Sequence, residues 1–317
     1  MTAYRTKLRI LISVDAFLAL VIALGLLFSP DSSDARATSF DLVESVEAVS
    51  TITIDGPDAV QLVRSGTNWN MKAPDGALPA DSARIESFLK AADSVSRLEP
   101  VARDKSSWPV LGLSGPEARR VTLSDSGGAV KRDFLLGNYA PSPGTVYFAL
   151  ADGPEAYSVA SGMASYILGK RNSWLDVRVW TAPPAPESVQ QIIVNGVFEG
   201  TGGSVQSLAY TVTRSGSGWV SDGIALDGAR VEAMVRALSA LRGDDYAPAA
   251  ESAGQAVVTV ELKLGNGRAL SLAVEGRRED GRYPARSSQR DRRIYLPSWS
   301  LAEVLKPLDQ LKTAAGS

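Results

Sequence analysis

The sequence predicts an α+β protein in which two copies of one folded unit follow a single transmembrane helix. Three observations support this prediction. An apolar run lies near the N-terminus, two stretches of seven residues agree at Arg, Ser, Gly and Trp, and the same order of strand-like and helix-like segments follows each stretch. With 317 residues, of which 44% are hydrophobic and 21% charged, the chain is long enough for two ordinary globular domains.

The composition excludes several kinds of chemistry. The chain has no Cys and no His, so it has no disulfide, no thiolate nucleophile and neither of the side chains that most often bind metals. Its net charge of −2 argues against general nucleic-acid binding. We therefore expect no metal, no cofactor and no nucleic-acid partner.

Residues 10–28 read ILISVDAFLALVIALGLLF and predict the transmembrane helix. At about 1.5 Å per residue this segment spans roughly 28 Å, close to the thickness of the hydrocarbon core. Residues 1–9 contain three basic side chains, which favours a cytoplasmic N-terminus and an extracytoplasmic, periplasmic main domain on the inner membrane. A signal peptide cleaved after Ala37 is the alternative, but its apolar core would be only about 7–15 residues long.

Asp15 lies inside this apolar run. A carboxylate at the centre of a membrane helix costs about 2.5–3.5 kcal/mol, and less near the end of the helix. Asp15 is close enough to the cytoplasmic end to reach the headgroups. Alternatively, it faces a donor on a partner helix, which makes it a candidate partner contact.

The repeated phrase is VRSGTNW from Val63 and TRSGSGW from Thr213. A strand-like stretch precedes each copy, and the Ser-Gly pair predicts a turn into a second strand, so each phrase is expected to form a β-hairpin. Trp69 and Trp219 then occupy equivalent places. We expect both to be structural anchors in the core, and not ligand-stacking residues.

A helix is expected after each hairpin, over residues 82–95 and 228–241. Apolar residues recur in both at the i, i+3, i+4, i+7 and i+10 spacing of one helical face. Asp81 or Ser82 is the predicted N-cap of the first helix, and Asp227 that of the second.

Strands are expected to return in both copies after the helices. RRVTLSD from Arg119 corresponds to VVTVELKLG from Val257, and Asn266-Gly267 predicts a tight turn into a further strand. Tyr157 and Tyr295 each lie in a strand that precedes a closing helix. The predicted organisation comprises a cytoplasmic tail (1–9), a transmembrane helix (10–28), a stalk (29–45), repeat 1 (46–180), a Pro-rich linker (181–188), repeat 2 (189–312) and a tail (313–317).

Residues 276–293 form the most unusual stretch, with seven Arg and three acidic residues. One interpretation is a solvated hairpin loop with internal ion pairs. The other is a contact surface for an acidic partner or an anionic lipid, since guanidinium groups suit carboxylate and phosphate. The candidate partner-binding residues are Arg286, Arg290, Arg292 and Arg293, and in an exposed loop their replacement by Ser would change stability by only about 0.5 kcal/mol.

Catalytic signatures are weak. Ser87 and Lys90 fit the S-x-x-K pattern but lie off the apolar helix face, without the partner motifs of that enzyme class. The carboxylate pairs Asp244-Asp245 and Glu279-Asp280, with Glu251, leave open a glycosidase-type hydrolase that works without His. We expect no catalytic residue, and this hydrolase is the least favoured reading.

The order of several short motifs over residues 45–310 resembles the domain-of-unknown-function 4340 family. These motifs are the SGTNW hairpin with its helix, LGLSGP from Leu111, LLGNYAPSPGTVYFAL from Leu135, AYSV from Ala156 and KRNSWLD from Lys170. The second repeat departs from the pattern, because it lacks the GLxxP match. The resemblance implies a membrane-anchored envelope protein of the kind encoded beside gliding-motility-type ABC transporters, and it implies no activity.

Together these features favour a non-enzymatic accessory or scaffold subunit of an ABC-type export or gliding-type envelope complex. Its expected partners are the membrane, a transporter permease and auxiliary subunits. The alternative is a free-standing envelope module that binds a glycan or an anionic lipid.

The membrane orientation is testable. Protease added to intact spheroplasts should digest the main domain, while an N-terminal fragment resists carbonate extraction, because residues 10–28 anchor the chain. A soluble periplasmic product that starts at Thr38 would establish cleavage instead.

Overall fold

The computed structural model describes residues 38–40, 42–43, 45–97, 100–160, 162–200 and 203–313. The predicted transmembrane segment and Asp15 lie outside these residues. Within the described ranges, no helix is both long enough and apolar enough to cross a membrane.

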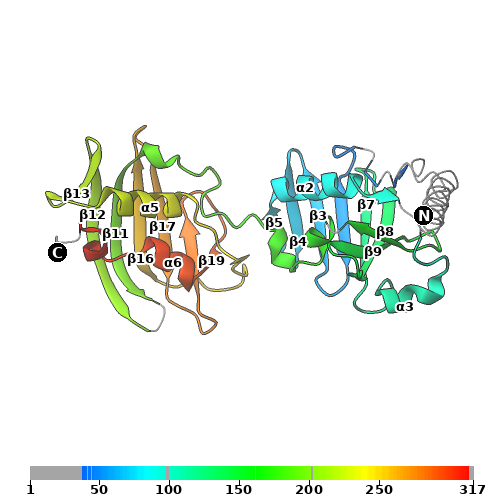
Figure 1. Cartoon of the computed structure of the whole chain (residues 1–317). Coiled ribbons are helices and arrows are strands. Elements are labelled where there is room, and N and C mark those ends of the chain that lie inside the picture. The colour runs from blue at the N-terminus through cyan, green and yellow to red at the C-terminus, as the bar shows by residue number, and fades with distance from the viewer. Residues whose placement is uncertain are drawn as a thin grey trace, which may run out of the picture.

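Two antiparallel sheets form the framework, as the predicted α+β class requires (Figure 1). The eight-stranded sheet has the order β10-β9-β8-β7-β2-β3-β4-β5. Its strands are β2 (Thr51–Asp55), β3 (Val60–Ser65), β4 (Asn68–Ala73), β5 (Gly76–Ala80), β7 (Arg119–Ser124), β8 (Val130–Tyr139), β9 (Thr145–Leu150) and β10 (Tyr157–Ala160).

The nine-stranded sheet has the order β14-β13-β12-β11-β16-β17-β18-β19-β15. Its strands are β11 (Val189–Glu199), β12 (Val205–Ser215), β13 (Gly218–Ser221), β14 (Ile224–Ala225), β15 (Asp245–Tyr246), β16 (Ala256–Leu264), β17 (Ala269–Glu275), β18 (Arg282–Ser287) and β19 (Ile294–Pro297). We compare the two sheets by counting strands across the first from β5 and across the second from β14. The first eight strands of the two sheets are then connected along the chain in the same order. The two sheets therefore share one topology, as a duplication predicts.

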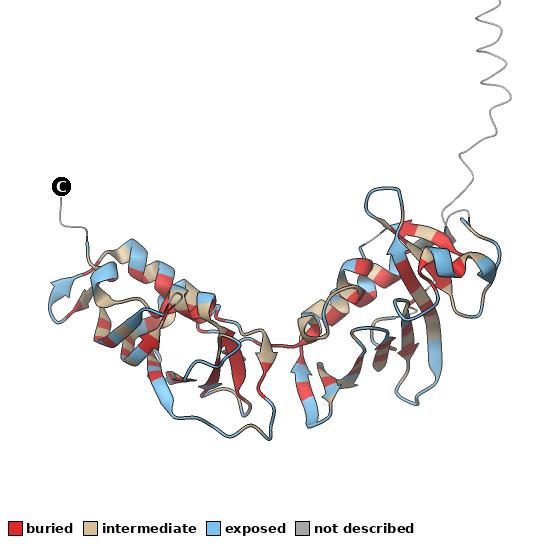
Figure 2. Ribbon diagram, turned by 90° about the horizontal axis from the view of Figure 1, so that it is seen from below, coloured by how far each residue is buried: buried red, intermediate tan, exposed pale blue. Residues whose placement is uncertain are grey.

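The helices cover one face of each sheet. The two long helices, α2 (Ser82–Asp93) and α5 (Gly228–Ser239), begin at the predicted N-caps Asp81 and Asp227, whose carboxylates accept backbone N–H groups of the first turn. The short helices are α3 (Trp108–Leu111), α4 (Ala164–Ile167) and α6 (Ser298–Val304). Figures 1 and 2 show the long helices on the same side of the molecule, so the other face of each sheet is open.

The repeated phrase encodes an arginine stacked on a tryptophan. Arg64 is directly opposite Trp69 in the β3–β4 pairing, and Arg214 is opposite Trp219 in the β12–β13 pairing. The guanidinium carbon lies 4.6 Å from the ring centroid in the first pair and 4.4 Å in the second. Both indoles are buried, and the cationic side chain covers each from the solvent side.

The Ser-Gly pair of the phrase makes the turn between the two strands. Gly66 and Gly216 have φ of +61° and +59°, a conformation that only Gly adopts without strain. Each stacked arginine also donates from Nε to the carbonyl of a residue before the first strand of its hairpin, Val49 at 3.0 Å and Val189 at 3.2 Å. The seven-residue stretch thus occurs in both units because it encodes three linked features. These are the hairpin turn, the arginine–tryptophan stack and the hydrogen bond from the arginine to a backbone carbonyl.

Part of the expected stalk belongs to the folded unit. Leu42 and Val43 are buried, and the Phe40 ring lies 4.8 Å from that of Phe148. The short strand β1 (Thr38–Ser39) pairs with β6 (Ser96–Arg97). The folded first unit therefore includes residues before the expected boundary of 46, because the side chains of Phe40, Leu42 and Val43 pack in or against its core.

The second unit begins with an equivalent segment. Val179 donates from its backbone N to the carbonyl of Leu241, as Phe40 donates to that of Val95. This places residues 177–180 at the start of the second unit, so the Pro-rich stretch 181–188 lies inside it. We therefore call residues 38–176 the first unit and residues 177–313 the second unit.

Replacing Trp219 by Ala should lower the free energy of unfolding by about 3–5 kcal/mol, because a large buried side chain leaves a cavity. Trp299 on α6 is 69% exposed, so Trp299→Ala is the matched control and should change it by only about 0.5 kcal/mol. Urea denaturation measures both. Equal stability of the two variants would show that Trp219 is not an anchor.

Candidate functional site at the junction of the two units

A connecting segment, residues 174–180, runs between the two units and pairs with both. Its backbone makes hydrogen bonds of 2.8–3.0 Å to the first unit and of 2.8 Å to the second. These bonds are Asp81 N to Trp174 O, Asp176 N to Pro79 O, Val179 N to Leu241 O and Gly243 N to Val177 O. The indole of Trp180 also donates to Leu238 O at 2.7 Å. The segment therefore fixes the edge of one unit against the edge of the other.

The carboxylate of Asp176 lies at the centre of this junction. Arg178 donates to both of its oxygens at 2.8 Å, and Nη2 of Arg290 lies 3.1 Å from Oδ2 as an ion pair without hydrogen-bond alignment. Tyr246 donates its hydroxyl hydrogen to the Asp176 carbonyl at 2.7 Å and accepts from Nη1 of Arg290 at 2.7 Å. Burial alone would raise the pKa of Asp176, but the Arg178 hydrogen bonds and the Arg290 charge outweigh it and lower the pKa to about 2.

Further contacts surround this centre. Asp75 accepts from Nη1 of Arg292 at 3.2 Å and from the backbone N of Ala249 at 2.9 Å. Asp81 pairs with Arg242 at 3.3 Å. In each ion pair the first unit supplies the carboxylate and the second unit supplies the guanidinium.

A cleft of about 710 Å³ opens between the two units beside these ion pairs. Its charged lining consists of three guanidinium groups and two carboxylates: Arg178, Arg242, Arg290, Asp81 and Asp176. Asn68, Asn70, Ser82 and Thr181 add neutral polar groups. Such a lining can bind a polar or anionic ligand.

The prediction that residues 276–293 form a solvated loop is wrong, because β18 runs through them. The side chains of Arg290 and Arg293 are 4% and 7% exposed, and Arg293 pairs with Glu275 at 2.9 Å. Arg292 is held by Asp75, and only Arg286 among the four candidates is exposed. The sum of charges in a sequence cannot show this, because the carboxylates that pair with these arginines come from distant segments.

The expectation that the four Ser replacements leave stability unchanged is therefore wrong as well. Removing one partner of a buried ion pair costs far more than a surface change. Whether Arg286 contacts a partner stays a prediction.

Three of the five carboxylates considered for hydrolysis take part in structural contacts. Glu251 pairs with Arg278 at 2.6 Å and accepts from the Tyr295 hydroxyl. Asp280 pairs with Arg282 at 2.8 Å, and Asp244 lies 3.6 Å from the same guanidinium. Across the described part of the chain, no three acidic side chains come together in a way that could hold a metal ion.

Residues 75, 81, 176, 178 and 242 were not recognised from the sequence as site residues. The available signal was the KRNSWLD motif, which holds Asp176 and also Asn172, whose side chain donates to Asp244 O at 2.8 Å. Trp174 of the same motif is buried against the ring of Phe88 at 5.6 Å. This motif thus joins the core of the first unit to the junction.

Arg290→Ser should lower the free energy of unfolding by about 3 kcal/mol at neutral pH, since it leaves the Asp176 carboxylate short of a charge partner. The pKa of folded Asp176 lies below its ordinary 3.8, so this stabilisation is present above about pH 4 and is lost as the pH falls towards 2. The difference between parent and variant should shrink over that range. Urea denaturation at several pH values tests this, with Arg286→Ser as the exposed control. An Arg290→Ser loss no larger than that control would contradict the buried-pair assignment.

Two further motifs pack against each other in the first unit. A Cβ atom at Gly137 would lie 2.2 Å from the carbonyl oxygen of Leu111, and Gly112 has φ of +71°. The LGLSGP and LLGN segments therefore need glycine at both places for their backbones to meet. This contact explains structurally why the two motifs occur together.

The comparison with known families gives one match. The model of a domain of unknown function, DUF4340, matches residues 69–257, from β4 of the first unit to β16 of the second, and so crosses the junction. No curated protein and no solved structure matches the chain. Because the match covers more than half of its length, the chain belongs to the DUF4340 family.

Proposed function

We propose that this protein is a non-enzymatic, membrane-anchored scaffold subunit of an ABC-type export or gliding-type envelope complex. In this proposal residues 10–28 anchor it in the inner membrane, and the two joined units bind partner subunits outside. The transporter setting comes from the family resemblance. The structural support is an exposed edge of the second unit, which we call the free end. It corresponds to the edge of the first unit that contacts the second unit at the junction.

The free end is the β13–β14 edge of the second unit, which corresponds to the β4–β5 edge of the first. Leu78 of β5 is 5% exposed beside residues of the second unit, whereas its counterpart Ile224 is 52% exposed. Asp75 is held by Arg292 and Ala249, whereas its counterpart Asp222 has no ion pair with any residue that the structure describes. Within the part of the chain that the structure describes, the surface that receives one unit inside the chain is therefore left largely exposed at this end.

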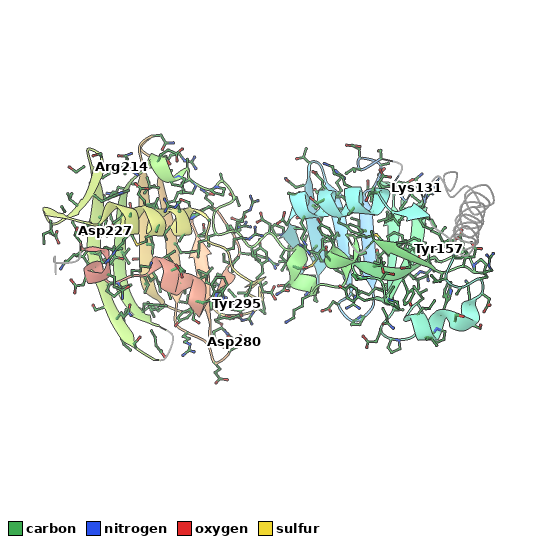
Figure 3. The ribbon with its side chains drawn as sticks, in the orientation of Figure 1. Lys131, Tyr157, Arg214, Asp227, Asp280 and Tyr295 are labelled. Atoms are coloured by element: carbon green, nitrogen blue, oxygen red, sulfur yellow. The ribbon has the colours of Figure 1, made fainter. Side chains whose placement is uncertain are left out.

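Charge argues that the partner at this end is not a second copy of the chain. By alignment of Tyr157 with Tyr295, the first unit carries Asp152 and Pro154 where the second unit carries Arg290 and Arg292. The outer end thus lacks counterparts of the two arginines that pair with Asp176 and Asp75 at the junction. Figure 3 shows Tyr157 and Asp227 towards the two opposite ends of the molecule. We infer a protein partner that presents arginine and a small apolar surface.

The test is copurification from membranes in mild detergent. Ile224→Asp should weaken recovery of the partner about tenfold or more, because burying an Ile side chain contributes about 1.5–3 kcal/mol. The partner must include an ATPase and a permease, identified by mass spectrometry. The parent should recover both in constant proportion.

Val205→Asp is the matched control, because Val205 is 69% exposed on β12 of the same unit. It should leave recovery unchanged, and both variants should unfold within about 0.5 kcal/mol of the parent. If Ile224→Asp and the parent recover the same transporter subunits, the free end is not the docking surface. If neither recovers any, the scaffold function is wrong.

A further inference from the structure

A second cleft lies next to the junction and has a different chemical character. It measures about 520 Å³ and is lined by Arg178, Arg236 and Arg242, by Ser239, Ala240 and Leu241, and by Pro183, Pro184 and Pro186. We propose that this cleft binds a phosphate group carried on an apolar body, as in a phospholipid. This inference does not depend on the transporter setting proposed above.

The charge of the lining favours an anion. Three guanidinium groups line the cleft and no carboxylate does. Arg178 uses Nε and Nη2 for Asp176, and Arg242 uses Nη2 for Asp81, so each keeps further donors. Arg236 is exposed in the last turn of α5, without an ion pair to any residue that the structure describes. Planar guanidinium groups suit phosphate oxygens because they donate in pairs.

The C-terminal end of α5 contributes to the lining, and the C-terminus of a helix carries partial negative charge, which opposes anion binding. Here the carbonyl of Leu238 accepts from the Trp180 indole at 2.7 Å, and Arg236 adds a full positive charge in the last turn. Ser239 is 7% exposed, and its hydroxyl has no hydrogen-bond partner among the described residues. The lining therefore includes Ser239, whose buried hydroxyl is unpaired, and arginines that keep unused guanidinium donors.

The apolar wall distinguishes this cleft from the larger polar one. Three prolines and Leu241 provide rigid, apolar surface beside the guanidinium groups. A rigid wall costs little conformational entropy when a ligand binds. This combination suits a phosphate with an attached alkyl chain better than free phosphate, and both share the same anionic group.

Calorimetric titration of the full chain in neutral detergent tests the proposal with three soluble probes: n-butyl phosphate, inorganic phosphate and n-butanol. Butyl phosphate should bind most tightly, inorganic phosphate more weakly, and butanol without measurable affinity. Arg236→Ser should weaken butyl phosphate binding about tenfold, the usual effect of losing a hydrogen bond to a charged group. Ala240→Glu, which places a carboxylate in the cleft, should abolish binding.

Two matched variants control for charge and helix effects. Arg268→Ser removes an exposed arginine from the β16–β17 turn, and Ala233→Glu introduces the same carboxylate on an exposed position of α5 outside the cleft lining. Both should bind butyl phosphate like the parent. Equal affinity for butyl phosphate and inorganic phosphate would support the phosphate site but assign it to a free anion.

The proposal is overturned if the parent binds neither phosphate probe. It is also overturned if the control variants lose as much affinity as the cleft variants. Ile224→Asp, at the opposite edge of the second sheet, should bind butyl phosphate normally. A failure of the phosphate site is thereby separated from a failure of the scaffold function.

Discussion

The carboxylate of Asp176 is the constraint on which the arrangement of the two units depends. It is mostly buried and lies between two guanidinium groups, one from its own segment and one from the second unit. A buried charge without partners would cost several kcal/mol, so the second unit must place Arg290 at this point for the junction to form. The backbone hydrogen bonds of residues 174–180 then fix the direction in which the second unit continues.

The same constraint gives the junction its specificity. Each unit has two different ends, and inside the chain the acidic end of the first unit meets the arginine-bearing end of the second. A head-to-tail contact of this kind would propagate into a filament if both free ends were complementary. Here the outer end of the first unit carries acidic residues at positions where the second unit has arginine. The duplication is therefore asymmetric in charge although it is symmetric in strand order.

The arginine-rich stretch, residues 276–293, shows that folding can turn a cluster of like charges into a set of structural ion pairs. Seven arginines close together would repel one another in an exposed loop. In the folded chain six of them pair with carboxylates, among them Arg277 with Glu199, Arg278 with Glu251, Arg290 with Asp176 and Arg292 with Asp75, and Arg286 is exposed. They hold the second unit together and join it to the first. The guanidinium groups that line the Pro-lined cleft, those of Arg178, Arg236 and Arg242, come from outside residues 276–293, so no charge count of that stretch would have indicated them.

The sequence by itself determined the local structure of this protein. Apolar periodicity predicted α2 and α5 to within two residues at their C-terminal ends. The repeated seven-residue stretch predicted both hairpins and both buried tryptophans. These features could be predicted because they depend on neighbours only a few positions away. Only the tertiary structure decided the start of each unit, the burial of Arg290 and Arg293, and the two clefts. The physical reason is separation along the chain: Asp75 and Arg292 are 217 positions apart, so their pairing depends on how two sheet edges meet. Such contacts leave no periodic signal in a single sequence.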